Sequence, residues 1–164
     1  MLLDDSVRGL ELVRREAEPV VDVGSGGGAP GIPLALALPE REFVLLEAQE
    51  RKCVFLRAHA PSNARVVWGR AEEQAVDWAG CALAKALAPP AAAAEWCLPL
   101  VRPGGAVVLW VGPTAEPETI RLVAEKLAAE VESAADGLVV LRKTGPTPEG
   151  FPRRPGMAKK RPLA

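Results

Sequence analysis

The sequence predicts an α/β fold in which a doubly wound, mostly parallel sheet ends in an antiparallel hairpin. Three observations indicate this class. Five short apolar runs alternate with segments of helical periodicity. A glycine-rich turn follows the first of these runs, and the dipeptide Asp136-Gly137 separates the last two apolar stretches. At 164 residues the chain is long enough for one domain with its own buried core.

The five apolar runs are the predicted parallel strands. They are rich in Val and Leu and show no regular alternation with polar residues, which is typical of strands buried on both faces. They cover residues 19–24, 42–48, 64–68, 81–87 and 105–112.

Helical segments lie between these runs. The first follows the glycine turn and begins near Pro30 and Pro33, where a missing backbone N–H costs little. Others are predicted over residues 48–60, 89–101 and 115–130, and residues 130–144 predict the hairpin. The last fifteen residues have no periodic apolar pattern. We therefore expect a domain over residues 1–150 and a proline-rich arm, tail-like or wrapped, over 151–164.

Composition excludes several classes of protein. No apolar run approaches the roughly 18 residues that a membrane span needs, and the first residues lack the basic start and apolar centre of a signal peptide. The three cysteines are odd in number and form no CxxC pair, which argues against disulfides and against a zinc site. We expect a reduced cytoplasmic protein without membrane or metal partners, and a monomer.

Charge is unevenly distributed along the chain. The net charge is −1, but the last fifteen residues contain five basic residues and no acid, which leaves 15 basic against 21 acidic groups elsewhere. A basic end of this kind favours an anionic partner such as RNA. The candidate RNA-binding residues are Arg153, Arg154, Lys159, Lys160 and Arg161. The alternative is a disordered, solvated tail.

The turn "VVDVGSGGGAPGIP", residues 20–33, is the main candidate site. Gly24, Gly26 and Ala29 satisfy the G-x-G-x-x-A pattern of dinucleotide sites. The other candidate ligand is S-adenosylmethionine, whose amino-acid part carries an ammonium and a sulfonium. Asp22, two residues before the first glycine, could hold the turn or face that ammonium, and it would repel a pyrophosphate. The sign of the charge favours the sulfonium ligand in a Rossmann-like site.

Two later segments extend this site. Glu47 closes the second strand, 23 residues after Gly24, where a carboxylate can accept both ribose hydroxyls of an adenosine. Taken alone, Glu47 fits NAD equally well. Ala71 and Glu72 follow the third strand and are placed to cover the adenine, although acids there also suit the first turn of a helix.

The stretch "DVGSGGGAPGIPLALALPEREFVLLEAQERKCVFLR", residues 22–57, closely resembles the nucleotide-binding half of the RsmG (GidB) family. Members of that family are S-adenosylmethionine-dependent methyltransferases that modify guanine N7 in 16S ribosomal RNA. The Pro30-Gly31-Ile32-Pro33 extension makes the pattern specific, and agreement continues through "GRAEE" to the basic C-terminus.

The resemblance implies a class I methyltransferase fold, with small-subunit RNA or its particle as partner. It implies cofactor contacts at Gly24, Ala29, Glu47, Ala48, Gln49, Ala71 and Glu72, and the candidate set also includes Asp22, Gly26, Gly28 and Lys85. Lys85 stands where the family usually has arginine, and it is the candidate for the polar group facing the reaction. It would contact the cofactor carboxylate or an RNA phosphate, and the alternative is an ion pair with a neighbouring acid.

The sequence also departs from the family pattern. Val111-Gly112 replaces a lysine-glycine pair, and Leu2 stands where a histidine would precede Asp5-Ser6. The family's longer N-terminal region is missing, so we expect either a late start or a shortened relative. These departures keep open a non-catalytic or retargeted cofactor-binding relative, and the glycine pattern keeps open a nicotinamide-dependent oxidoreductase. Removing the arm after Gly150 is expected to weaken RNA binding and to spare the cofactor.

Overall fold

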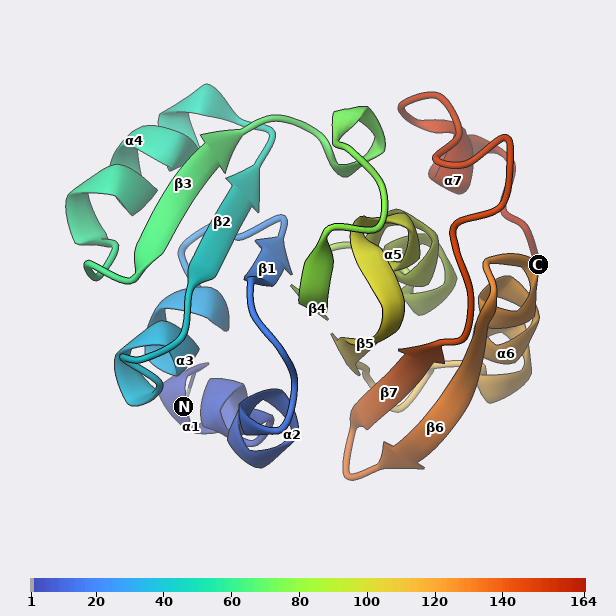
Figure 1. Cartoon of the computed structure of the whole chain (residues 1–164), viewed down its shortest axis with the longest axis horizontal. Helices are drawn as coiled ribbons and strands as arrows, with labels where there is room; N and C mark the ends of the chain where they lie inside the picture. Colours follow the sequence, from blue (N-terminus) through green and yellow to red (C-terminus); the bar gives the residue numbers. More distant parts are fainter. Residues whose placement is uncertain (1) are drawn as a thin grey trace.

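The apolar runs form one seven-stranded sheet in the order β3-β2-β1-β4-β5-β7-β6 (Figure 1). The computed structural model describes residues 2–164, and their side chains from residue 4 onward. The first five strands pair in parallel, and β6 and β7 form the antiparallel hairpin at one edge. The predicted fold class is therefore confirmed. The strands are β1 (Val20–Val23), β2 (Phe43–Glu47), β3 (Ala64–Trp68), β4 (Ala79–Lys85), β5 (Val101–Trp110), β6 (Ala129–Ala135) and β7 (Leu138–Lys143).

Helices connect the strands, and several end earlier than the sequence predicts. The predicted helix 115–130 ends at Lys126, because Ala128 has a φ of 55° and begins the turn into β6. The predicted helix 89–101 ends at Cys97, and β5 already begins at Val101. The helices are α1 (Leu2–Val7), α2 (Leu10–Arg14), α3 (Gly31–Ala37), α4 (Glu50–His59), α5 (Pro90–Cys97), α6 (Pro117–Lys126) and α7 (Met157–Lys160), with 3₁₀ turns η1 (Ala71–Glu73) and η2 (Leu98–Leu100).

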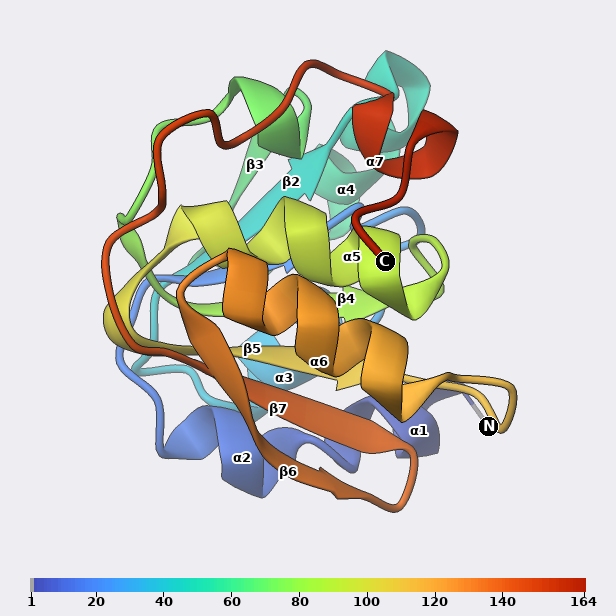
Figure 2. The same cartoon turned by 90° about the vertical axis from the view of Figure 1, so that its right-hand side faces the viewer.

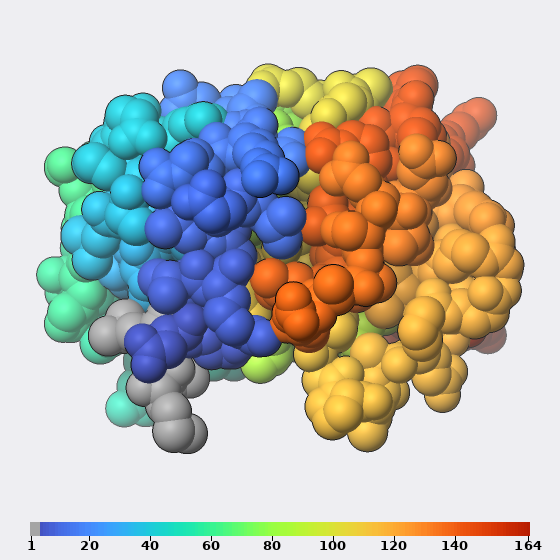
Figure 3. Space-filling model, turned by 90° about the horizontal axis from the view of Figure 1, so that it is seen from below, coloured from blue at the N-terminus to red at the C-terminus, as the bar shows by residue number. Residues whose placement is uncertain are grey.

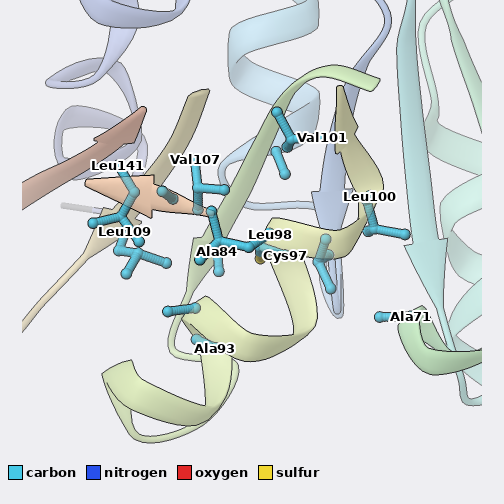
Figure 4. Packing of buried hydrophobic residues seen from close by; sticks show 14 of the residues in the cluster. Ala71, Ala84, Ala93, Cys97, Leu98, Leu100, Val101, Val107, Leu109 and Leu141 are labelled. Atoms are coloured by element: carbon cyan, nitrogen blue, oxygen red, sulfur yellow. The ribbon is translucent and has the colours of Figure 1, made fainter. Parts of the chain in front are cut away.

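Both faces of the central strands β1, β2 and β4 are buried, as the apolar runs predict. Successive strand residues belong to different layers: Val20 and Cys81 pack with α2 and α3, whereas Val21 and Ala82 pack with α5 and α6. Figure 2 shows these helices above and below the sheet. In Figure 4, residues of α5 and η2, among them Cys97, lie close to residues of the central strands. The central parallel strands therefore have no solvent face. The prediction is wrong for β3, an edge strand in which no residue is fully buried and Trp68 is 56% exposed.

The N-terminal helices are fixed to the hairpin. In Figure 3 the blue N-terminal segment lies beside the orange hairpin. An Arg8 nitrogen donates to the backbone oxygen of Asp136 at 2.5 Å, and the Trp110 indole donates to the backbone oxygen of Asp5 at 2.9 Å. Arg142 of β7 binds both carboxylate oxygens of Glu16 at 2.8 Å. These contacts hold α1 and α2 against the sheet.

A buried lysine joins β7 to the loop before β4. The side chain of Lys143 is fully buried, and its Nζ donates to Asp77 at 3.1 Å and to the backbone oxygens of Leu98 and Val101 at 2.8 and 2.9 Å. Burial lowers the pKa of Lys143. Burial opposes ionisation of Asp77 as well, but hydrogen bonds from Thr147 and Lys143 outweigh it and lower the pKa of that carboxyl. Thr147 thereby fixes the start of the C-terminal segment.

Residues 151–164, the C-terminal arm, pack against the domain (Figure 2). Phe151 and Leu163 contact the apolar layer of α5 and α6. Arg153 binds both oxygens of Glu95 at 2.6 Å, and Glu95 is only 4% exposed. Of the two forms considered for this segment, tail or wrapped arm, the structure has the wrapped arm. It also contains the short helix α7, which the sequence pattern does not predict. Among residues 2–164, no helix is both long and apolar enough to cross a membrane.

Candidate functional site

A cavity of about 360 Å³ lies at the carboxyl ends of β1 and β2. Six of the predicted cofactor residues line it, which are Gly24, Glu47, Ala48, Gln49, Ala71 and Glu72. This is the edge of a doubly wound sheet at which ligands are expected. A larger cavity of about 550 Å³ lies between α6 and the hairpin, and no predicted cofactor residue lines it. We therefore take the 360 Å³ cavity as the candidate site because predicted cofactor residues line it, although it is the smaller of the two.

Glu47 is the best-defined polar group of this cavity. It is 6% exposed, and its two carboxylate oxygens accept hydrogen bonds from the backbone N–H of Gly26 at 2.8 Å and of Gln49 at 2.9 Å. A carboxylate oxygen has a second lone pair, so each can still accept a hydroxyl. The two amides fix the position of the carboxylate before any ligand arrives. This arrangement fits the predicted contact to the two ribose hydroxyls.

The glycine turn reaches Glu47 because its backbone adopts conformations that favour glycine. Gly24, Gly26 and Gly28 have φ values of 69°, 53° and 98°. Gly24 lines the cavity, whereas Gly26 lines a neighbouring hollow with Phe55. Gly28 and Ala29 line neither, so their predicted cofactor contacts remain predictions.

Asp22 lies behind the turn and does not line the cavity. It is 1% exposed, and its Oδ2 accepts the N–H of Gly31 at 3.0 Å, at the start of α3. A Cβ on Gly31 would lie 2.6 Å from that oxygen, which explains the glycine. Of the two roles predicted for Asp22, this geometry fits holding the turn. Burial raises the pKa of Asp22 to about 7.

Lys85 points to the N-terminal helix instead of the cavity. Its side chain is 12% exposed, and its Nζ lies 2.8 Å from Oδ2 of Asp5. The contact with Lys85 lowers the pKa of Asp5 more than any other contact. The ion pair considered as the alternative for Lys85 is therefore present, and its catalytic and cofactor roles remain predictions. Val111 lines the larger cavity, and the side chain of Leu2 lies outside the described residues.

Several lining residues are not predicted from the sequence. The sequence predicts Trp96 of α5 as a core residue and Lys159 as part of an RNA-binding arm. In the structure both line the 360 Å³ cavity. The Lys159 ammonium lies 5.5 Å from the centre of the Trp96 ring. The remaining lining residues outside the predicted set are Val23, Leu46, Lys52, Gly69, Arg70, Ala86 and Leu87. Local patterns cannot identify Trp96 or Lys159, because each reaches the cavity through tertiary packing.

The five basic residues predicted for RNA divide into three environments. Arg153 is paired with the buried Glu95 and anchors the arm. Lys159 lines the cavity, and Arg154, Lys160 and Arg161 have exposed side chains on the same arm. Lys159 is exposed as well, so four exposed cations of the arm are available for phosphates.

The volume of the cavity falls within the range of small-molecule sites. The carboxylates of Glu47 and Glu72 line it together with the cations Lys52, Arg70 and Lys159. The charge of the lining alone therefore does not choose between a cationic ligand and a pyrophosphate. Among residues 4–164, no group of three or more His, Cys, Asp or Glu side chains could hold a metal ion.

Comparison with known proteins shows the family of this chain. The family model GidB, described as rRNA small subunit methyltransferase G, matches residues 1–140. Proteins named ribosomal RNA small subunit methyltransferase G are 38% identical in Pelotomaculum thermopropionicum and 34% identical in Moorella thermoacetica. These matches cover 97% and 99% of this chain and 76% of each relative.

Solved methyltransferases share the fold at low sequence identity. CcbJ from Streptomyces caelestis has a TM-score of 0.69 at 15% identity, over 87% of this chain and 96% of that one. CalO1, a methyltransferase in calicheamicin biosynthesis solved in its SAH-bound form, has a TM-score of 0.66 at 16% identity, over 86% and 54%. The predicted class I methyltransferase fold is thus confirmed. With the family model covering most of its length and these relatives matching nearly all of it, the chain belongs to the GidB family of small-subunit rRNA methyltransferases G.

Proposed function

We propose that this protein transfers a methyl group from S-adenosylmethionine to guanine N7 of small-subunit (16S) ribosomal RNA. Membership of the family supports the reaction. The observation that carries the proposal in this chain is the carboxylate of Glu47, which two backbone amides hold at the wall of the cavity. The protein would act as a monomer in the cytoplasm and without a metal.

In this proposal the cavity residues bind the cofactor. Glu47 accepts the ribose hydroxyls, and Gly24 allows close approach of the ligand to the backbone of the turn. Ala48, Ala71 and Glu72 surround the adenine. Family membership, and not the charge of the lining, favours S-adenosylmethionine over NAD, because Lys52, Arg70 and Lys159 line the cavity beside its two carboxylates. The oxidoreductase alternative rests on the glycine pattern and on Glu47, which suit either ligand.

Methyl transfer to guanine N7 requires that the two reactants are positioned correctly more than it requires acid–base groups. The bound cofactor supplies a methyl group activated by a cationic sulfur, and guanine N7 offers a lone pair that carries no proton. The protein therefore needs no general base, and its contribution is to orient the two reactants and exclude water. The position of His59 agrees, because it stacks on Phe55 in α4 and its ring nitrogen bonds to the Phe55 oxygen, away from the lining residues.

RNA would approach across the basic side of the cavity. Lys52 and Arg70 line it, and the exposed cations of the arm continue the same charge. Phosphate contacts from several cations make affinity fall steeply as salt rises. Substituting Arg154, Lys160 and Arg161 together should therefore reduce both RNA affinity and its dependence on salt.

Two measurements test the function. Incubation with S-adenosylmethionine labelled on its methyl group should place label in guanine of 16S RNA or of small-subunit particles. Calorimetry should show binding of S-adenosylhomocysteine and none of NAD. Cofactor binding without any transfer to RNA would favour a non-catalytic or retargeted relative, and tight NAD binding alone would refute the site assignment.

The variant Glu47→Gln tests the residue that carries the proposal. It replaces an oxygen that accepts a backbone N–H with an amide that cannot accept. Hydrogen bonds to charged groups contribute about 1.5–3 kcal/mol, so affinity for S-adenosylhomocysteine should fall by roughly 10- to 100-fold. Glu50→Gln, at the exposed start of α4, is the control and should bind like the wild type. Unchanged affinity in the Glu47 variant would remove this residue from the site.

A further inference from the structure

The C-terminal arm reaches the wall of the cofactor cavity. Lys159 lines the cavity together with Trp96, and its ammonium lies over the indole ring at 5.5 Å from the ring centre. The backbone N–H of Gly156 also lies within hydrogen-bonding distance, 3.4 Å, of a carboxylate oxygen of Glu72. The arm therefore contacts two segments that line the same cavity, α5 and η1.

The arm is held firmly enough to serve as a wall. Arg153 binds both oxygens of the buried Glu95, one residue before Trp96. At the other end of α7, Leu163 packs against the apolar layer, and its backbone oxygen accepts a hydrogen bond from Lys126 at 2.5 Å. Lys159 lies between these two attachments. Its position thus depends on the fold of the arm and on α5.

Trp96 contributes a donor that is not satisfied within the protein. Its indole Nε1 is buried and has no hydrogen-bond partner among the described residues. Buried polar groups in native proteins are nearly always paired. Because Trp96 lines the cavity, its unpaired donor suggests an acceptor that comes from the ligand. The adenine nitrogens and the carboxylate of the cofactor are acceptors of the required kind.

We propose that the C-terminal arm completes the cofactor site, and that Lys159 and Trp96 are cofactor-binding residues. The proposal rests on the proposed function for the identity of the ligand. It changes the expectation drawn from the sequence, in which removal of the arm spares the cofactor. Loss of the arm removes Lys159 from the wall and uncovers Trp96, so cofactor binding and RNA binding should both weaken.

The test compares two neighbouring lysines in the full-length chain. Lys159→Met keeps the apolar stem and removes the ammonium, and Lys160→Met makes the same change at an exposed residue that does not line the cavity. Titration calorimetry with S-adenosylhomocysteine, without RNA, should show about tenfold weaker binding for the Lys159 variant, the effect of losing one charged contact. The Lys160 variant should bind like the wild type. Trp96→Phe, which removes only the donor and one ring, should also weaken binding.

A second measurement reports on the arm itself. Bound S-adenosylhomocysteine should slow tryptic cleavage at the basic residues of α7 in the wild type, and this protection should shrink in the Lys159 variant. Circular dichroism of each variant verifies that it is folded.

The outcomes separate this inference from the proposed function. The inference would be overturned if both lysine variants bound S-adenosylhomocysteine with equal affinity and the ligand did not protect the arm from trypsin. If the wild type still bound the cofactor and methylated RNA, the proposed function would stand. A wild-type protein that does not bind S-adenosylhomocysteine would overturn both.

Discussion

Replacing Asp22 with asparagine should change how the stability of the protein depends on pH. Asp22 is 1% exposed, and burial raises its pKa to about 7 from an ordinary value of 3.8. As the pH rises between these values, the unfolded chain releases the proton while the folded chain keeps it. The contribution of Asp22 to the free energy of unfolding is therefore fully present below about pH 4. It decreases as the pH rises and reaches its minimum above about pH 7.

The size of the effect follows from the two pKa values. A difference of about three between them corresponds to roughly 4 kcal/mol of lost stability above neutral pH, and to roughly 2 kcal/mol at about pH 5. Asparagine does not titrate, and its carbonyl oxygen can still accept the N–H of Gly31. The stability of the variant relative to the wild type should therefore increase by roughly 2 to 3 kcal/mol between about pH 5 and about pH 8.

Urea denaturation followed by circular dichroism measures this difference at both pH values. Asp136→Asn, which alters an exposed acid in the hairpin turn, is the matched control and should show no comparable change between the two conditions. A stability difference for Asp22→Asn that stays constant with pH would refute the reasoning. It would mean that Asp22 is already ionised in the folded protein at about pH 5.

The same denaturation experiment tests two further positions. Gly31→Ala should cost about 1–3 kcal/mol, because its Cβ would meet Asp22 and the Leu45 side chain at 2.6 Å. Gly27→Ala, where nothing lies within 4 Å of the new Cβ, is the control, and equal losses would contradict the packing argument. Lys143→Met should cost about 3–5 kcal/mol, since it leaves two backbone oxygens without their donor and the Asp77 carboxylate without its cationic partner. A loss below about 1 kcal/mol would show that water replaces the ammonium.

The sequence predicts those parts of the fold that local patterns determine. The five parallel strands are continuous apolar runs, and Asp136-Gly137 marks the hairpin turn, so both are recognisable without tertiary information. Element ends are less well predicted. β4 ends at Lys85 because Ala86 has a φ of 53°, and no local signal marks an alanine for that conformation. Glu47 is predicted as a site residue from its place at a strand end, but its hydrogen bond with the Gly26 amide is not predicted.

The remaining parts depend on contacts between distant residues. Asp22 turns away from the cavity because its partner, the Gly31 amide, becomes available only when α3 forms. The ion pair of Lys85 with Asp5 joins positions 80 residues apart in the sequence. Trp96 and Lys159 meet only after the arm folds back over α5. The sequence suggests that Asp22 holds the turn and that Lys85 pairs with an acid, but no periodicity or motif identifies the partner residue in any of these contacts.

The placement of the three cysteines has a practical consequence. Cys53 lies in α4 with its Sγ 3.4 Å from the backbone oxygen of Glu47, Cys81 lies in the layer of α2 and α3, and Cys97 in the layer of α5. Burial raises the pKa of all three thiols, so each would react with a maleimide only when its surroundings open. In variants that retain only one of the three cysteines, the rate of maleimide labelling would therefore measure local opening. Comparing the three rates would show whether the ligand edge or one of the two helical layers opens first.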